Sequence, residues 1–135
     1  MILVDTNVLS ELPRRKPHAG VLRWLAGQEA IAISAISVEE LAFGVARAPL
    51  ARQAKLVRWL DKLLASTAAI LSADLAVARA AGELRATREA AGRRVAQADM
   101  LIAATALVHG LTLVTRNGRD FEGCGVALFD PFLTP

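Results

Sequence analysis

Four acidic side chains are the residues best suited to do chemistry together, namely Asp5, Glu40, Asp99 and Asp120. Carboxylates held close together cannot all stay ionised unless a cation lies among them. A site of oxygen ligands suits Mg²⁺ or Mn²⁺, whereas zinc and copper favour histidine and cysteine, of which the chain has two and one. Such ions activate a water molecule and stabilise the oxygens of a phosphoryl displacement. The four acids therefore indicate metal-assisted cleavage of a phosphate ester.

The elements that must position these acids are short apolar strands that alternate with helices. The apolar runs predict strands over residues 2–4, 30–33, 69–71, 111–115 and 126–129. Helical spacing predicts helices over residues 7–12, 18–26, 50–64, 73–91 and 98–109, capped or closed by Ser72, Gly92 and Gly110. A further helix is expected to open at Ser37, where Glu40 completes the spacing of a capping box. The alternation requires crossover connections, so we expect one α/β domain over residues 1–135, a three-layer α/β/α sandwich around a mostly parallel sheet.

This topology predicts that all four acids lie at one edge of the sheet. Asp5 ends the first strand, and Glu40 lies in the first turn of the helix after the second strand. Asp99 lies in the first turn of the helix that leads into the fourth strand, and Asp120 lies in the loop that leaves it. Parallel sheets bind ligands at the carboxyl edge, so the shared position favours one site over four separate caps or turns. The topology does not distinguish Glu40 from Glu39.

Four segments carry a resemblance to a known family: MILVDTNVLSE, SAISVEELAFG, QADMLIAATA and LVTRNGRDF. They span nearly the whole chain, and the first and third are specific in combination. With these segments the chain resembles the PIN-domain ribonucleases and, within them, the VapC-type toxins of toxin–antitoxin pairs, including the FitB-like branch. The fold that this resemblance implies is the same α/β sandwich.

The resemblance also implies a set of site residues. Asp5, Glu40 and Asp99 match three acidic metal ligands of the family, which selects Glu40 over Glu39. The fourth acid varies between members, so Asp120 and Asn117 are alternatives for that position. Polar positions that support the site by hydrogen bonding are matched by Thr6, Asn7 and Thr115.

The activity that the resemblance implies is that of a Mg²⁺- or Mn²⁺-dependent endoribonuclease that inhibits translation. Members are usually homodimers, and a small VapB-like antitoxin neutralises them by wrapping the toxin and occluding its site. RNA, an antitoxin protein and a second copy of the chain are therefore the expected partners.

The charge balance agrees with a polyanionic substrate. The 135 residues include 16 Lys and Arg against 13 Asp and Glu, a formal net charge of +3. If the four candidate acids surround a metal, 9 acids remain and the rest of the chain carries +7. We consider contact with an RNA backbone for Arg94, Arg116 and Arg119. The other arginines between residues 79 and 94 have the spacing of exposed ion pairs with Glu83 and Glu89.

Composition excludes several other classes of protein. The hydrophobic fraction of 54% excludes a disordered chain, and a single cysteine excludes a disulfide framework. The start of the chain lacks the basic region of a signal peptide, and the uncharged stretch 100–115 is too short for a membrane span. We therefore expect a cytoplasmic protein without a membrane segment.

Two alternatives would use Asp5 in phosphate transfer without RNA. An aspartyl-phosphate phosphatase would need a second Asp two positions later, where this chain has Asn7. A receiver-like phosphoacceptor domain would need a lysine near the last strands, but the lysines are at positions 16, 55 and 62. A third alternative is an interaction module without activity, which the presence of all four acids disfavours.

The remaining reactive side chains are interpreted as structural. His18 is expected at the surface, and His109 is expected at a helix C-terminus, where partial positive charge is favourable. Cys124 lies in a turn between two glycines and has no paired histidine that could make it a nucleophile.

Overall fold

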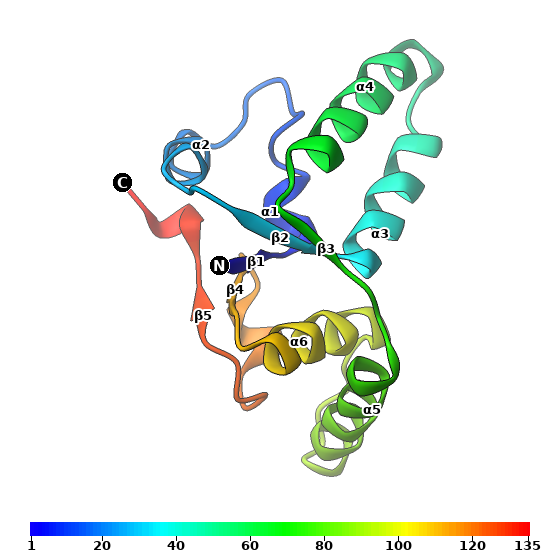
Figure 1. Ribbon diagram of the computed structural model, residues 1–135, viewed down its shortest axis with the longest axis vertical. Helices are drawn as coiled ribbons and strands as arrows, with labels where there is room; N and C mark the ends of the chain where they lie inside the picture. Colours follow the sequence, from blue (N-terminus) through cyan, green and yellow to red (C-terminus); the bar gives the residue numbers. More distant parts are fainter.

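A parallel sheet of five short strands forms the centre of the computed structural model, which describes residues 1–135 (Figure 1). The strands are β1 (Ile2–Val4), β2 (Ile31–Ser34), β3 (Ala69–Leu71), β4 (Thr112–Val114) and β5 (Leu128–Phe129). Their spatial order is β3-β2-β1-β4-β5, and every pair of neighbours is parallel. The expected α/β sandwich is thus confirmed, with a sheet that is entirely rather than mostly parallel.

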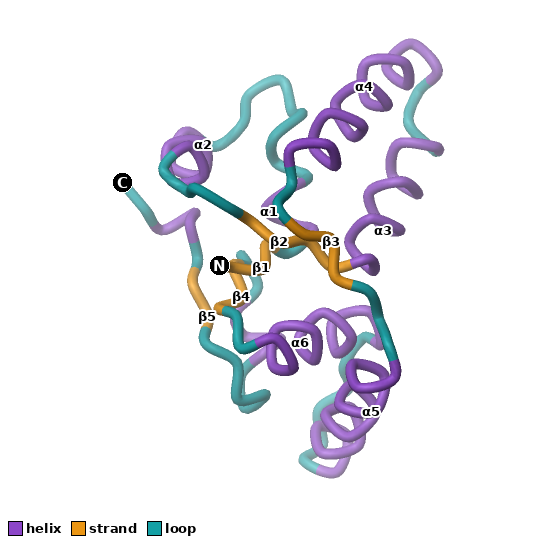
Figure 2. The backbone as a smooth tube through the Cα atoms, viewed as in Figure 1, coloured by secondary structure: helices purple, strands orange, loops and turns teal.

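Six α-helices cover the two faces of the sheet (Figure 2). They are α1 (Thr6–Leu9), α2 (Ala19–Ala26), α3 (Ala35–Ala46), α4 (Leu50–Ser66), α5 (Leu75–Ala90) and α6 (Gln97–His109). Two 3₁₀ helices follow, η1 (Gly118–Phe121) and η2 (Pro131–Leu133). The helices α5 and α6 pack on one face, whereas α1 to α4 lie on the other, where α3 and α4 form a projecting arm.

Alternation along the central strands separates two hydrophobic cores. Successive residues of a strand point to opposite faces of the sheet. Leu3 therefore joins the core under α5 and α6, while the next residue, Val4, joins the core under α1 to α4. Leu113 and Val114 divide in the same way in β4. Because helices bury both faces, these strands read in the sequence as continuous apolar runs.

The beginnings of two helices differ from the sequence prediction. The helix α3 begins at Ala35, because Ser34 ends β2 and caps the helix by accepting a hydrogen bond from the Ile36 N–H at 3.1 Å. The predicted capping box at Ser37 is therefore wrong, and Glu40 lies in the second turn rather than the first. The helix α5 is capped by Asp74 and not by Ser72. In both cases a nearer polar side chain satisfies the free N–H groups of the first turn.

The helix ends predicted at Gly92 and Gly110 agree with the structure, whereas α1 ends at Leu9 rather than at residue 12 and α4 continues to Ser66 rather than ending at residue 64. Gly92 follows α5 with φ of +79°, and Gly110 caps α6 in the left-handed region with φ of +64°. Side chains with a Cβ rarely adopt this conformation, so glycine is the suitable residue at both ends. None of the helices has the length and apolar character needed to cross a membrane.

Candidate functional site

Asp5 is the buried centre of the predicted site. It directly follows β1, and its backbone N–H donates to the Val114 carbonyl of the neighbouring strand at 2.8 Å. Its side chain is only 4% exposed, although it is a carboxylate. Oδ1 accepts a hydrogen bond from the Thr6 N–H at 2.7 Å, and Oδ2 accepts one from the Thr115 hydroxyl at 2.7 Å. The carboxylate is therefore held in one orientation at the carboxyl edge of the sheet.

Thr115 connects Asp5 to the loop after β4. Its hydroxyl donates to Asp5 and accepts hydrogen bonds from Asn7 Nδ2 at 3.3 Å and from the Asn117 backbone N–H at 3.1 Å. The Oδ1 atom of Asn7 in turn accepts from the Arg116 N–H at 3.2 Å. The predicted supporting residues Asn7 and Thr115 thus form one network around Asp5, while Asn117 joins it through its backbone.

Glu40 is held near Asp5 by Thr6. The Thr6 hydroxyl lies 2.7 Å from Glu40 Oε1, to which it donates, and 2.9 Å from Ser37 Oγ. Ser37 and Glu40 are three residues apart, so they share the face of α3 that meets Thr6. The spacing that suggested a capping box is therefore explained by this shared contact. Glu39, in contrast, is exposed and makes no hydrogen bond in the structure.

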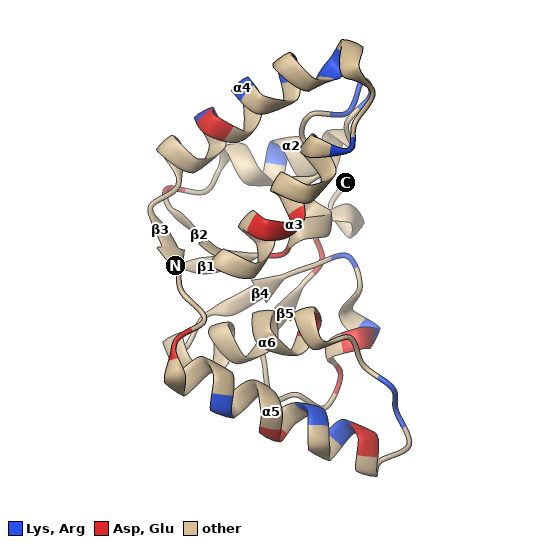
Figure 3. Cartoon of the chain, turned by 90° about the vertical axis from the view of Figure 1, so that its right-hand side faces the viewer, with Lys and Arg blue, Asp and Glu red and all other residues tan.

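Asp99 and Asp120 approach the same edge from the other side. Asp99 lies in the first turn of α6, as predicted, and is half-buried. Asp120 lies in η1, after β4, and both residues line one pocket. Figure 3 shows the acidic positions of α3 and α6 facing the same side of the molecule. Asp120 therefore shares a pocket with Asp99, whereas Asn117 contributes a backbone hydrogen bond to Thr115.

Neighbouring acids raise the pKa of Asp5 and of Asp99. Burial raises the pKa of Asp5, and the charges of Glu40 and Asp120 raise it further, against the hydrogen bonds from Thr115 and Thr6. Burial, followed by repulsion from Asp5, Asp120 and Glu40, raises the pKa of Asp99 to about 6. Asp5 and Asp99 therefore lie close enough to the other acids to be repelled by them in a partly buried site.

No basic side chain neutralises this group of acids. The two ion pairs of the structure, Arg14–Glu11 and Arg85–Glu89, involve none of the four. An all-oxygen set of carboxylates with shared, uncompensated charge is the donor chemistry that Mg²⁺ or Mn²⁺ prefers, so these residues fit such an ion. No three His, Cys, Asp or Glu side chains already form a metal-binding group, so this fit rests on donor chemistry and charge.

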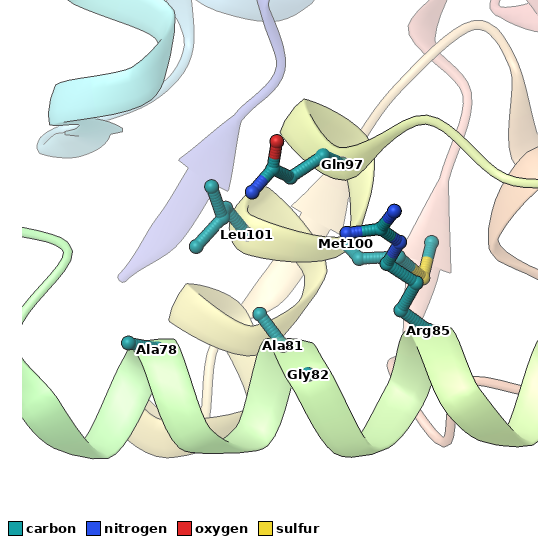
Figure 4. A pocket seen from close by; sticks show the side chains of 7 residues that line it. All are labelled: Ala78, Ala81, Gly82, Arg85, Gln97, Met100 and Leu101. Carbon is teal, nitrogen blue, oxygen red and sulfur yellow. The ribbon is translucent and has the colours of Figure 1, made fainter.

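Two other features lie apart from the acids. A cavity of about 160 Å³ between α5 and α6 is lined by none of them (Figure 4); its lining includes Arg85, Gln97 and Met100. Cys124 is buried, and burial raises the pKa of its thiol, which disfavours the nucleophilic thiolate. The structural interpretation of Cys124 therefore agrees with the structure.

Two residues play structural roles that the sequence did not indicate. His18 is not simply a surface residue, because its Nδ1 caps α2 by accepting from the Val21 N–H at 3.3 Å. Glu11 is buried and accepts hydrogen bonds from Arg14 Nη1 and the His18 N–H, so it secures the loop before α2. The only sequence signal for Glu11 was its position near the end of a short helix.

The arginines of α5 also depart from the predicted exposed pairs. Only Arg85 and Glu89 approach each other, at 4.0 Å. Arg88 is buried, and its Nε and Nη2 have no hydrogen-bond partner. It reaches the backbone of Gly123, where an added Cβ would lie 2.5 Å from its Nη1.

Comparison with known proteins identifies the relatives of this fold and site. The PIN domain family matches residues 2–124. The plasmid stability protein StbB of Pseudomonas syringae pv. tomato is 43% identical, over 98% of this chain and 99% of that protein. The VapC ribonuclease Y4jK of Sinorhizobium fredii is 36% identical, over 98% of both chains. The crystal structure of FitAcB from Neisseria gonorrhoeae is similar with a TM-score of 0.92 and 38% identity, over 98% of this chain and 99% of that one.

Proposed function

The chain belongs to the PIN-domain family, and from that membership and its acidic site we propose that it is a metal-dependent endoribonuclease, the toxin of a toxin–antitoxin pair. The relative named as a VapC ribonuclease supports the reaction class. The proposed single domain over residues 1–135 carries this whole activity.

One observation carries the proposal: four carboxylates from four separate segments share one edge of a parallel sheet without a basic partner. Glu40 and Asp120 raise the pKa of both Asp5 and Asp99, and Asp5 also raises that of Asp99. Uncompensated negative charge opposes folding, so its concentration at this edge calls for a ligand that compensates it.

The four acids would together hold Mg²⁺ or Mn²⁺. When bound, such an ion activates water and stabilises the attacking and leaving oxygens of phosphodiester hydrolysis. Thr115 and Thr6 act as positioning residues, because their hydroxyls orient the carboxylates of Asp5 and Glu40. Fixed orientation of ligand carboxylates is the usual contribution of such neighbours to a metal site.

The test is RNA cleavage by matched variants. Asp5→Asn and Glu40→Gln should each reduce Mg²⁺-dependent cleavage about 100-fold or more, a loss typical of removing one preorganised electrostatic group. Glu39→Gln, the same change one position earlier, should leave cleavage within about twofold of the wild type because Glu39 is exposed and unbonded. Cleavage that persists in excess chelator, or in Asp5→Asn, would contradict the metal-dependent mechanism.

The partners are proposed on the same basis. A VapB-like antitoxin and a second copy of the chain are expected for a VapC-type toxin, and RNA as a substrate implies action in the cytoplasm. The projecting arm of α3 and α4 offers apolar surface for such contacts, because Phe43 in α3 is 59% exposed and Leu50 in α4 is 86% exposed. Sedimentation that shows only monomer at micromolar concentration would contradict the homodimer.

The phosphate-transfer alternatives are less well supported. Asn7 donates a hydrogen bond to Thr115 in the position where a phosphatase would need an acid. All three lysines are exposed and lie in the 13–17 loop or in α4, away from β4 and β5. Intact-mass measurement after treatment with a small phosphodonor should therefore show no phosphorylated chain.

A further inference from the structure

A pocket lined by both arginines and aspartates adjoins the proposed metal site. It has a volume of about 250 Å³ and is lined by Arg93, Arg94, Asp99 and Asp120, together with two small apolar residues. Two of the four proposed metal ligands thus line the same pocket as two arginines. A second pocket of about 300 Å³ shares both arginines and is otherwise lined by Glu89 and Gly92. The two pockets form one groove that leaves the acidic site past the arginines.

The loop that carries these arginines is fixed relative to the acids. Arg93 donates from Nη2 to the Arg119 carbonyl at 2.8 Å, and its backbone N–H donates to the Arg88 carbonyl at 2.9 Å. Because Arg119 and Asp120 are neighbours in η1, this bond joins the arginine loop to the helix that carries the fourth acid. The predicted ion pair of Arg93 with Glu89 is not formed.

Arg94 has no partner within the chain. It is exposed and makes neither a hydrogen bond nor an ion pair, although Asp99 and Asp120 line the same pocket. Arg116, which the sequence also suggested for RNA contact, is engaged differently, because its guanidinium lies 4.4 Å from the centre of the Phe132 ring. Figure 3 shows that basic positions gather in the segment between α5 and α6.

We propose that this groove is a phosphate subsite, in which Arg94, assisted by Arg93, binds the backbone phosphate next to the one that is cleaved in single-stranded RNA. The inference rests on the proposed function and specifies how its substrate is held. A guanidinium binds phosphate oxygens through paired N–H groups, which suits a neighbouring phosphodiester. The positive charge of the two arginines would also attract the approaching polyanion, which the acids repel.

The test measures RNA binding without cleavage. In an Asp5→Asn background with EDTA, the affinity for a fluorescein-labelled single-stranded RNA of about ten nucleotides is measured by anisotropy at several salt concentrations. Arg94→Ala should weaken binding about fivefold and reduce the slope of log affinity against log salt by about 0.7, the value for one lost phosphate contact. Arg94→Lys should retain part of the affinity. The matched control Arg58→Ala removes the same charge from the exposed face of α4 and should change the affinity less than twofold.

The outcomes separate the subsite from the proposed function. In the active chain, Arg94→Ala should raise KM for RNA cleavage while kcat stays unchanged, because the lost contact is equally strong in substrate and transition state. If Arg94→Ala weakens RNA binding no more than Arg58→Ala does, or if the chain binds no RNA at low salt, the phosphate subsite is wrong. An effect of Arg94→Ala on binding to a protein partner would not change that conclusion. If the wild-type chain binds RNA through Arg94 but does not cleave it, the proposed function is refuted and the subsite is retained.

Discussion

Replacing Asp99 with asparagine should stabilise the metal-free protein at pH 8, although it removes a residue of the proposed active site. The pKa of Asp99 is raised from 3.8 to about 6 by burial and by three neighbouring carboxylates. A carboxyl whose pKa is higher in the folded state than in the unfolded state binds protons preferentially when folded. Its ionisation therefore costs stability, and this cost develops between about pH 4 and 6 and is complete above pH 6.

The magnitude follows from the two pKa values. One pKa unit corresponds to about 1.4 kcal/mol, so the difference between 3.8 and about 6 sets an upper limit of about 3 kcal/mol. Asp99 is only half-buried, and solvent screening reduces this limit to the order of 1 kcal/mol. For a chain of this length, such a change raises Tm by about 3 °C.

Thermal unfolding in EDTA at pH 8 and pH 4 tests this reasoning. Asp99→Asn should unfold about 3 °C above the wild type at pH 8, and the difference should largely disappear at pH 4. The control Asp61→Asn makes the same charge change on the exposed face of α4 and should shift Tm by less than about 1 °C. Addition of millimolar Mg²⁺ should stabilise the wild type more than Asp99→Asn. A variant that is no more stable than the wild type at pH 8 would refute the charge repulsion inferred here.

Three further changes test the supports of the site and fold. Thr115→Val should destabilise the chain by about 1–3 kcal/mol in urea unfolding, because it removes a donor from the buried Asp5 carboxylate. The loss should be larger at pH 8 than at pH 4, since the Thr115 hydrogen bond lowers the pKa of Asp5; an equal loss at both pH values would contradict that role. Gly110→Ala should cost about 1 kcal/mol because the C-cap of α6 has φ of +64°. Gly44→Ala should instead stabilise the chain by about 0.5–1 kcal/mol, because Gly44 lies inside α3 with open space around it; the same sign of effect at both glycines would refute this distinction.

The order of strands and helices could be predicted because it depends on local properties of the chain. Continuous apolar runs, helical periodicity and the glycines with positive φ at the ends of α5 and α6 determine where most elements begin and end. The errors fell at helix starts such as Ser34 and Asp74, where several polar residues compete to cap the same N–H groups. Which residue succeeds depends on where the preceding strand ends, and this is decided by pairing within the sheet.

The sequence by itself determined that Asp5, Asp99 and Asp120 follow or lead into strands, and hence that they share the carboxyl edge of a parallel sheet. The family resemblance already selected Glu40 over Glu39, but only the tertiary structure gave the physical reason, which is that Glu40 meets Thr6 across 34 residues of sequence. It alone showed that Thr115 orients Asp5 and that Arg93 and Arg94 border the acids. These contacts join segments far apart in the chain, so no local pattern encodes them, whereas the strands and helices that bring them together are encoded locally.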